Sequence, residues 1–297
     1  QALGADVTHH IRAILLGMQR IRNSWELGKI SWSVLRSDHT LAWFPVLSGL
    51  VSLLVLGAFT GLVATTGVTT VDGKESLQAI GWVFIVVGYI VLAFVATYFL
   101  AALVHGANER LEGRDASLGG SLAAANAKLH RILPWAIVQG TVSVLISAIE
   151  ERAGFVGQII VRLIGAAWAI VTFLTIPIIM MEDLGPWNAL KRSGTLLKQT
   201  WGENLAAQAG FGLFAMAASI PGIALIALGV ATNDTIGLVG LGLIGVIWIL
   251  IVSVVISAMS GIYRIALYRF AVDGKAPGAF ASADLGGAFG PRASDKN

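Results

Sequence analysis

Six long apolar stretches, separated by short polar segments, limit what this chain can fold into. The hydrocarbon core of a bilayer is about 30 Å thick, so a helix that crosses it needs roughly 20 mainly apolar residues. Six stretches approach or exceed that length, and the third is the shortest. They cover residues 41–63, 77–104, 133–149, 159–181, 205–231 and 236–263. We therefore predict an all-α, polytopic membrane protein with six transmembrane helices.

Charged residues are scarce in this chain. Only 12% of its residues are Asp, Glu, Lys or Arg, whereas an ordinary soluble domain has about 25%. The 35 glycines and 9 tryptophans are typical of membrane helices and of their ends at headgroup level. Cysteine is absent, which excludes disulfides, thiolate nucleophiles and cysteine metal sites.

The positive charges are distributed unevenly between the segments that connect the apolar stretches. If both termini are cytoplasmic, all of the 20 lysines and arginines except Lys74, Arg152 and Arg162 lie on the cytoplasmic side. Loops rich in Lys and Arg remain in the cytoplasm. The sequence therefore predicts cytoplasmic N and C termini, with the loop "TTVDGKES" on the opposite side of the membrane.

An amphipathic segment that contains two tryptophans precedes the first apolar stretch. Its apolar residues recur at intervals of three and four, so they share one face of a helix. Three cations spaced seven apart follow the flank of this apolar stripe. A helix of this kind lies in the membrane interface and does not cross the bilayer. The stripe is Ile14, Met18, Ile21, Trp25, Gly28, Trp32 and Leu35, and the cations are Arg22, Lys29 and Arg36.

A similar segment returns before the fifth stretch, where "RSGTLLKQTW" (192–201) matches "NSWELGKISW" (23–32). Its stripe is Trp187, Leu190, Gly194, Leu197 and Trp201, with Lys191 and Lys198 as the flanking cations. A weaker third copy is "SLAAANAKLHRILPW", with Leu118, Leu122, Ala125, Leu129 and Ile132 in register and Lys128 alongside.

Each copy precedes two apolar stretches, so we predict three units, each an interfacial helix followed by a transmembrane hairpin. The units cover about residues 9–105, 117–182 and 185–272 of a single membrane domain, 1–275. Because each unit has an even number of spans, the repeats would be parallel. The alternative is a chance recurrence of Trp, Lys and Leu. The remainder, 276–297, is predicted to be a loosely packed cytoplasmic tail.

The cations of the two better copies are the candidate site residues, because lysine and arginine near the inner leaflet attract anionic lipid. The candidate headgroup-binding residues are Arg22, Lys29, Arg36, Lys191, Arg192 and Lys198, and the candidate interfacial anchors are Trp25, Trp32, Trp187 and Trp201.

The other groups of charged residues are better explained by structural roles than by catalysis or metal binding. His105, Glu109 and Glu112 share a helical face, but solvation of a charged loop explains them better than metal binding. Adjacent Glu182 and Asp183 are expected to cap the next helix, which begins near Pro186. The predicted spans contain almost no ionisable residue at mid-depth, which argues against a proton pump.

Two prolines and a group of glycines lie inside the later stretches. Pro177 and Pro221 predict kinks that packing absorbs, although a broken helix that lines a binding cavity is the alternative. The glycines in "GLVGLGLIGVIW" (237–248) favour close helix packing over a pore.

Three segments together resemble an uncharacterised family of prokaryotic six-span membrane proteins, classed as a domain of unknown function. They are "SWELGKISWSVLRSDHTLAWFPVLSGL", "EDLGPWNALKRSGTLLKQTWGENL" and "IYRIALYRFAVDGKAPGAF". The second is also distantly similar to the membrane domain of glycerophosphodiester phosphodiesterases, but no catalytic barrel accompanies it here. The resemblance implies the cytoplasmic membrane of a prokaryote and no activity or site residues.

The resulting functional hypothesis is a non-catalytic membrane protein, a scaffold or accessory subunit of a membrane assembly. Its expected partners are membrane lipids, with other membrane proteins or a second copy left open; no cofactor, metal or nucleic acid is expected. The alternative is a carrier or channel for a neutral or lipidic solute. It would need a cavity between the fourth and fifth spans, lined by Gln139, Gln208 or Thr172.

Overall fold

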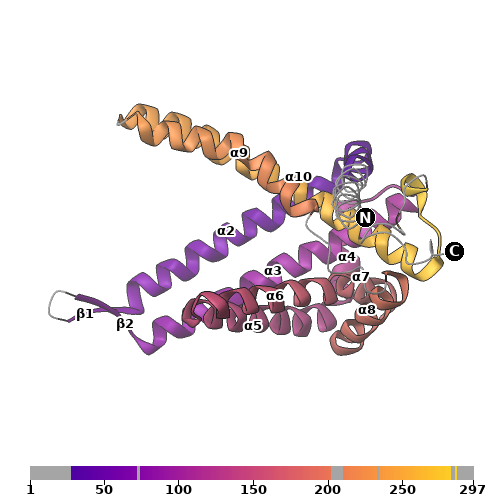
Figure 1. Ribbon diagram of the computed structural model, residues 1–297, viewed down its shortest axis with the longest axis horizontal. Helices are drawn as coiled ribbons and strands as arrows, with labels where there is room; N and C mark the ends of the chain where they lie inside the picture. The colour runs from indigo at the N-terminus through magenta and orange to yellow at the C-terminus, as the bar shows by residue number, and fades with distance from the viewer. Residues whose placement is uncertain (1–27, 72–73, 202–209, 233, 282–284, 286–297) are drawn as a thin grey trace, which may run out of the picture. The chain divides into compact units, whose positions relative to one another are not determined.

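The computed structural model describes residues 28–71, 74–201, 210–232, 234–281 and 285. The described chain consists of helices and one short hairpin (Figure 1). Residues 28–37 are helical. The further elements are α2 (Thr40–Thr66), β1 (Val68–Val71), β2 (Lys74–Leu77), α3 (Ala79–Leu111), α4 (Leu118–Ala127), α5 (Leu129–Arg152), α6 (Phe155–Val171), α7 (Thr175–Met181), α8 (Pro186–Trp201), α9 (Gly210–Ala231), α10 (Thr235–Asp273) and the 3-10 helix η2 (Gly278–Phe280).

The chain divides into two compact units. One is Trp43–Leu196, and the other combines Gln1–Ala42 with Leu197–Asn297. The division falls inside α8, so it differs from the three consecutive units expected from the repeats. The parallel-repeat hypothesis stays a prediction.

A two-stranded antiparallel hairpin joins α2 to α3 in the first unit. Val68 pairs with Leu77 and Val71 with Lys74. At its base, a Cβ on Gly67 would lie 2.6 Å from the Gly81 Cα atom, so two glycines allow the backbones to meet there. The sequence predicted only a loop here, and it assigned Leu77 to the second span. That assignment was wrong, because Leu77 ends β2 and α3 begins at Ala79.

The predicted fourth span is broken into two helices. Pro177 has no N–H for the Phe173 carbonyl, and its ring crowds that carbonyl, so a helix is interrupted near this point. Accordingly α6 ends at Val171 and α7 begins at Thr175. Pro221 has no such effect, since α9 continues through it.

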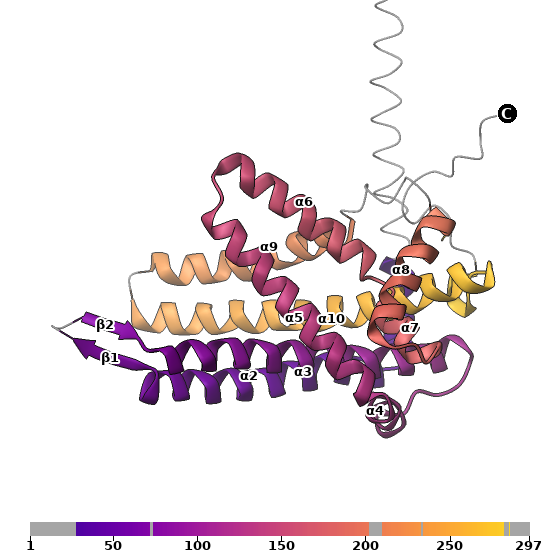
Figure 2. The ribbon, with the colours of Figure 1, turned by 90° about the horizontal axis from the view of Figure 1, so that it is seen from below.

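In the second unit, α9 and α10 pack side by side in opposite directions (Figures 1 and 2). A Cβ on Gly245 would lie 2.6 Å from the Gly222 carbonyl oxygen, and the Trp248 indole N–H donates to the Ala218 carbonyl at 2.9 Å. Gly245 thus serves close helix packing within this pair, whereas nothing lies within 4 Å of the Cβ position of Gly240 or Gly242.

Buried residues concentrate at one end of the long helices. In α3 they include Ala101–Val104, and in α10 they include Ala258, Ile262 and Ile265–Tyr268. The residues of α7 from Thr175 to Met180 are all buried. The opposite portions of α2, α3 and α10 are lined with exposed leucine, isoleucine and valine.

The helical prediction is confirmed in its coarse form, since five helices of the described residues are long and apolar enough to cross a membrane. These are α2, α3, α5, the broken pair α6–α7, and α10. The remaining one, the fifth predicted span (205–231), corresponds to α9, whose 22 residues begin at Gly210; residues 205–209 lie outside the described residues. A six-span arrangement stays a prediction.

Candidate membrane-surface site

Helix α8 has two clearly different faces. Its buried face repeats at helical spacing through Ala189, Ser193, Leu196 and Leu197, which are at most 3% exposed. Its first residue is Pro186, which suits the first turn of a helix because the missing N–H would have no intrahelical partner there.

The outward side of α8 carries Trp187, Lys191 and Lys198, which we call the α8 surface face. Trp187 is 63% exposed, and both lysines are exposed. These three positions recur at intervals of four and seven, which aligns them along one line of the helix. The Lys191 Nζ atom lies 5.6 Å from the centroid of the Trp187 ring, within the range of a cation–π contact.

Two other candidate residues of α8 have surroundings that the sequence did not predict. Trp201 is only 5% exposed; its indole N–H donates to the Leu285 carbonyl at 3.0 Å and its ring lies 6.2 Å from that of Phe270. Arg192 forms an ion pair with Glu182 at 3.2 Å. The structure therefore places Trp201 in packing and gives Arg192 a protein partner.

Residues 28–37 repeat the division seen in α8. Ser31, Val34 and Leu35 are buried, whereas Trp32 is 45% exposed and Lys29 and Arg36 are exposed. Trp32 is therefore exposed, whereas Leu35 of the same predicted stripe is buried. Lys29, Trp32 and Arg36 recur at intervals of three and four, so this helix also presents a tryptophan with two cations. The candidates Arg22 and Trp25 lie outside the described residues.

The third proposed copy is interrupted at Lys128. The helix α4 ends at Ala127 and α5 begins at Leu129, so the predicted stripe is divided between two helices. Ser121, Ala125 and Ile132 are buried. Lys128 at the break forms an ion pair with Asp183.

The carboxylates between α7 and α8 form ion pairs with cations. Arg131 Nη2 lies 3.0 Å from Asp183 Oδ2, and Lys128 contacts the other oxygen of that carboxylate. Hydrogen bonding to Lys128, with the charges of Lys128 and Arg131, holds the pKa of Asp183 below its usual value. Asp183 also has a φ of 55°, in the left-handed region that Asp tolerates better than most residues. Both carboxylates pair with cations, and the expected capping role of Glu182 and Asp183 stays a prediction.

The acidic residues at the end of α3 pair with Arg114. Its Nε atom lies 2.5 Å from Glu109, and its Nη2 atom lies 2.5 Å from Glu112. These carboxylates raise the pKa of the Arg114 guanidinium. Among the described residues, no three His, Asp or Glu side chains gather in a way that would hold a metal ion.

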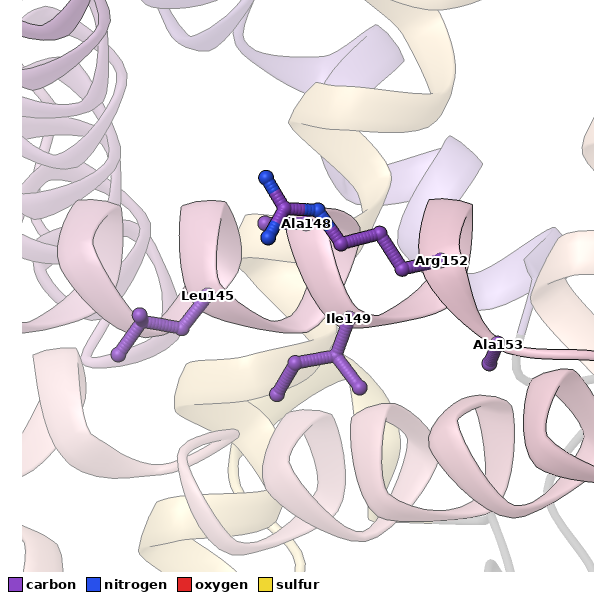
Figure 3. A pocket seen from close by; sticks show the side chains of 5 residues that line it. All are labelled: Leu145, Ala148, Ile149, Arg152 and Ala153. Carbon is purple, nitrogen blue, oxygen red and sulfur yellow. The ribbon is translucent and has the colours of Figure 1, made fainter.

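Figure 3 shows an open depression along the end of α5. It is lined by Leu145, Ala148, Ile149, Arg152 and Ala153. Four of these residues come from the end of α5, Ala153 directly follows it, and only Arg152 is polar, so the depression lacks the convergent polar groups of a ligand site.

The residues named for a solute pathway have separate surroundings. The Thr172 hydroxyl donates to the Trp168 carbonyl of its own helix at 2.8 Å. The Gln139 side-chain oxygen is buried and has no hydrogen-bond partner in the described structure. Gln208 lies outside the described residues.

Three features were not predicted from the sequence: the packing of two tail residues, the role of Ser193 and the β hairpin. Phe280 and Leu285, at most 1% exposed, show that the tail is packed at these points rather than loose, which corrects the expectation for that segment. Ser193 was noted only as a match to Ser24, yet it is fully buried and bonds to the backbone between α6 and α7. The sequence signal for the β hairpin was Asp72-Gly73 between strand-like residues, a common hairpin dipeptide.

Five of the described helices are long and apolar enough to cross a membrane, as is typical of the class of helical membrane proteins. Within that class it belongs to a family of unknown function, DUF6159, whose model matches residues 79–278. No curated protein and no solved structure matches the chain. The resemblance to an uncharacterised family is thus confirmed, whereas the similarity to glycerophosphodiester phosphodiesterases stays a prediction.

Proposed function

We propose that this chain is a non-catalytic integral membrane protein of a prokaryotic cytoplasmic membrane, with six spans and both termini in the cytoplasm. Its helix α8 and the helix at residues 28–37 lie on the inner leaflet and contact anionic lipid headgroups. In this role the protein serves as a scaffold or accessory subunit of a membrane assembly.

The observation that carries the proposal is the α8 surface face. A helix with one apolar buried side and an opposite edge of tryptophan and lysine suits the membrane interface, where the indole ring sits at headgroup level and the ammonium groups meet phosphates. Trp187, Lys191 and Lys198 provide these groups on one line of α8. Lys29, Trp32 and Arg36 provide the same set at residues 28–37.

The charge distribution supports the proposed orientation. Lys29, Arg36, Lys191 and Lys198 would all be on the cytoplasmic side, where anionic lipids give the leaflet a negative potential. Each cation near such a surface contributes about 1 kcal/mol, which corresponds to roughly a fivefold change in lipid preference. The ion pair with Glu182 reduces the contribution expected of Arg192.

The test replaces Lys29, Lys191 and Lys198 by glutamate in one variant. Protein is extracted with a mixture of phosphatidylglycerol and phosphatidylcholine, and the retained lipids are quantified by mass spectrometry. We expect the variant to lose most of its preference for phosphatidylglycerol, and added salt to weaken the preference of the unaltered protein.

Lys275→Glu is the matched control, because Lys275 is exposed but lies beyond α10, outside both surface helices. It should keep the lipid preference. Equal retention of phosphatidylglycerol by the triple variant and the control would refute the proposed lipid contact.

A carrier or channel for a neutral solute is the second candidate, and one observation favours it. The buried Gln139 oxygen has no protein partner in the described structure, and an unsatisfied polar group is costly inside a membrane. Gln139→Leu should abolish uptake of a neutral solute into vesicles if the protein transports one. Unchanged uptake would remove this candidate.

A further inference from the structure

Ser193 connects α8 to the break between α6 and α7. Its hydroxyl donates to the Val171 carbonyl at 2.5 Å and accepts from the Leu174 N–H at 3.3 Å. Val171 is the last residue of α6, and Leu174 directly precedes α7. A single side chain on one helix therefore bonds to both sides of an interruption in another segment.

The side of the break next to α7 needs such a partner because Leu174 is buried. Leu174 and Ser193 are both 0% exposed, so water does not replace a missing hydrogen bond at the Leu174 N–H, whereas Val171 is 38% exposed. The position of Pro177 interrupts the helix, but it does not determine the angle between α6 and α7. Ser193 bonds to one residue on each side of the break, so its hydroxyl limits how far Val171 and Leu174 can separate.

Ion pairs stabilise the turn between α7 and α8. Arg192 pairs with Glu182, while Lys128 and Arg131 pair with Asp183. Because Ser193 follows Arg192 directly, a displacement of α8 would move its hydroxyl relative to the α6–α7 break. Trp187 and Lys191 of the α8 surface face lie on a different side of the same helix and in the same unit as Ser193, so a displacement of Lys191 moves Ser193.

We propose that anionic lipid, by holding the α8 surface face at the membrane, sets the bend between α6 and α7 through the hydrogen bonds of Ser193. This inference rests on the proposed function, since it requires α8 to contact anionic headgroups. Ser193 is a positioning residue in this scheme, and the partner is the phosphate-bearing headgroup of an inner-leaflet lipid. The protein would thereby adjust the shape of a membrane-crossing segment to the charge of the surrounding leaflet.

The experiment measures a distance across the break. The chain has no cysteine, so cysteines introduced at Ala166 in α6 and Asn188 in α8, both exposed, carry the only two spin labels. The distance distribution is recorded in nanodiscs of phosphatidylcholine and in nanodiscs of phosphatidylglycerol. We expect one narrow distance in phosphatidylglycerol and a broader, displaced distribution in phosphatidylcholine.

Two variants test the coupling. Ser193→Ala should give the broad distribution in both lipids while it still retains phosphatidylglycerol in the extraction assay. Thr195→Ala is the matched control, because the exposed Thr195 hydroxyl bonds only to the Lys191 carbonyl of its own helix at 3.0 Å. It should respond to lipid as the unaltered chain does.

A separate variant, with Lys191→Glu and Lys198→Glu and Ser193 intact, tests the coupling should Ser193→Ala fail to fold. It should give the broad distribution even in phosphatidylglycerol, and retention of the narrow distance would overturn the inference. The inference is likewise overturned if folded Ser193→Ala keeps the narrow distance, or if the unaltered protein retains phosphatidylglycerol but shows the same distribution in both lipids. If the unaltered protein does not retain phosphatidylglycerol, the proposed function is refuted, and this inference with it.

Discussion

The two parts of α10 have similar sequences but different surroundings. Ile244, Ile247 and Ile251, in its first part, are each 53–56% exposed, whereas Ile262 and Ile265 are fully buried. The helix is continuous from Thr235 to Asp273. The difference therefore arises from what covers each part: protein encloses the later turns, and the earlier turns depend on another apolar medium, which a bilayer provides.

Helix α3 shows the same division in the other unit. Trp82, Val83 and Val86 near its start are 46–57% exposed, while Ala101, Ala102 and Val104 are fully buried. Large side chains occupy the exposed portion and mostly small ones the buried portion. Close packing of protein helices favours small residues, whereas lipid tails accommodate large ones without a fixed fit. Each unit thus has one end enclosed by protein and one end suited to lipid.

The largest expected effect comes from a cavity in the enclosed part of α10. Ile262→Ala should lower the free energy of unfolding by about 2–5 kcal/mol, because the site loses both apolar contact and packing volume. Ile247→Ala is the control, since lipid or detergent fills the space that the shortened side chain leaves. Thermal unfolding in detergent micelles measures both variants. Equal destabilisation would mean that protein also covers the earlier turns.

A charge in the exposed part of α10 tests whether that part meets lipid. Ile247→Lys should impair membrane insertion, because a lysine at mid-membrane costs roughly 2.5–3.5 kcal/mol. Val272→Lys is the control on the same helix; Val272 is 43% exposed and lies near the end of α10. Cell-free synthesis with membrane vesicles, followed by alkaline extraction, reports insertion. If both variants insert equally well, the exposed part of α10 does not reach the hydrocarbon.

The contact between α9 and α10 gives an intermediate effect. Gly245→Val places a side chain against the Gly222 carbonyl, where even a Cβ would be 2.6 Å from the oxygen, and overpacking of this kind costs about 1–3 kcal/mol. Gly240→Val should be tolerated, because nothing lies within 4 Å of its Cβ position. Disulfide formation between cysteines at Ala218 and Ile249 measures whether the two helices stay together. An unchanged yield in the Gly245 variant would show that the helices do not need this approach.

The apolar runs predicted most of the long helices because their length and composition are local properties. The faces of α8 were predicted less well. Trp187 and Trp201 both belong to the stripe that the sequence indicates, yet one is exposed and the other is buried against Phe270 and bonded to Leu285. No local pattern distinguishes them, because the partners of Trp201 lie about 70 to 85 residues further along the chain.

The break in the fourth apolar stretch was half predictable. Pro177 predicted a kink in this stretch, but Pro221 predicted one equally and α9 continues through it. The hydroxyl that serves the break belongs to Ser193, 19 and 22 residues after the two residues to which it bonds. Its role depends on how α8 packs against the break.

The positions of the proposed lipid-facing cations were partly predictable for a similar reason. Lys191 and Lys198 are exposed, as helical spacing predicts, but the Glu182 partner of Arg192 follows from the turn between α7 and α8.

The smallest expected effect concerns the ion pairs outside the long apolar helices, at the turn between α7 and α8. The Asp183 carboxylate is 60% exposed, so Asp183→Asn should lower the unfolding temperature only slightly at neutral pH.

The pKa of Asp183 is lower in the folded protein than in the unfolded chain, owing first to the hydrogen bond from Lys128. The contribution is therefore fully present above the ordinary carboxyl pKa of about 3.9 and is lost as the pH falls through the lowered folded value. The difference in unfolding temperature between the unaltered protein and Asp183→Asn should stay constant from neutral pH down to about pH 5 and vanish in stronger acid. Asp115→Asn, at a fully exposed carboxylate that contacts Arg110, is the matched control. A difference for Asp183→Asn that grows on acidification would contradict the ion-pair assignment.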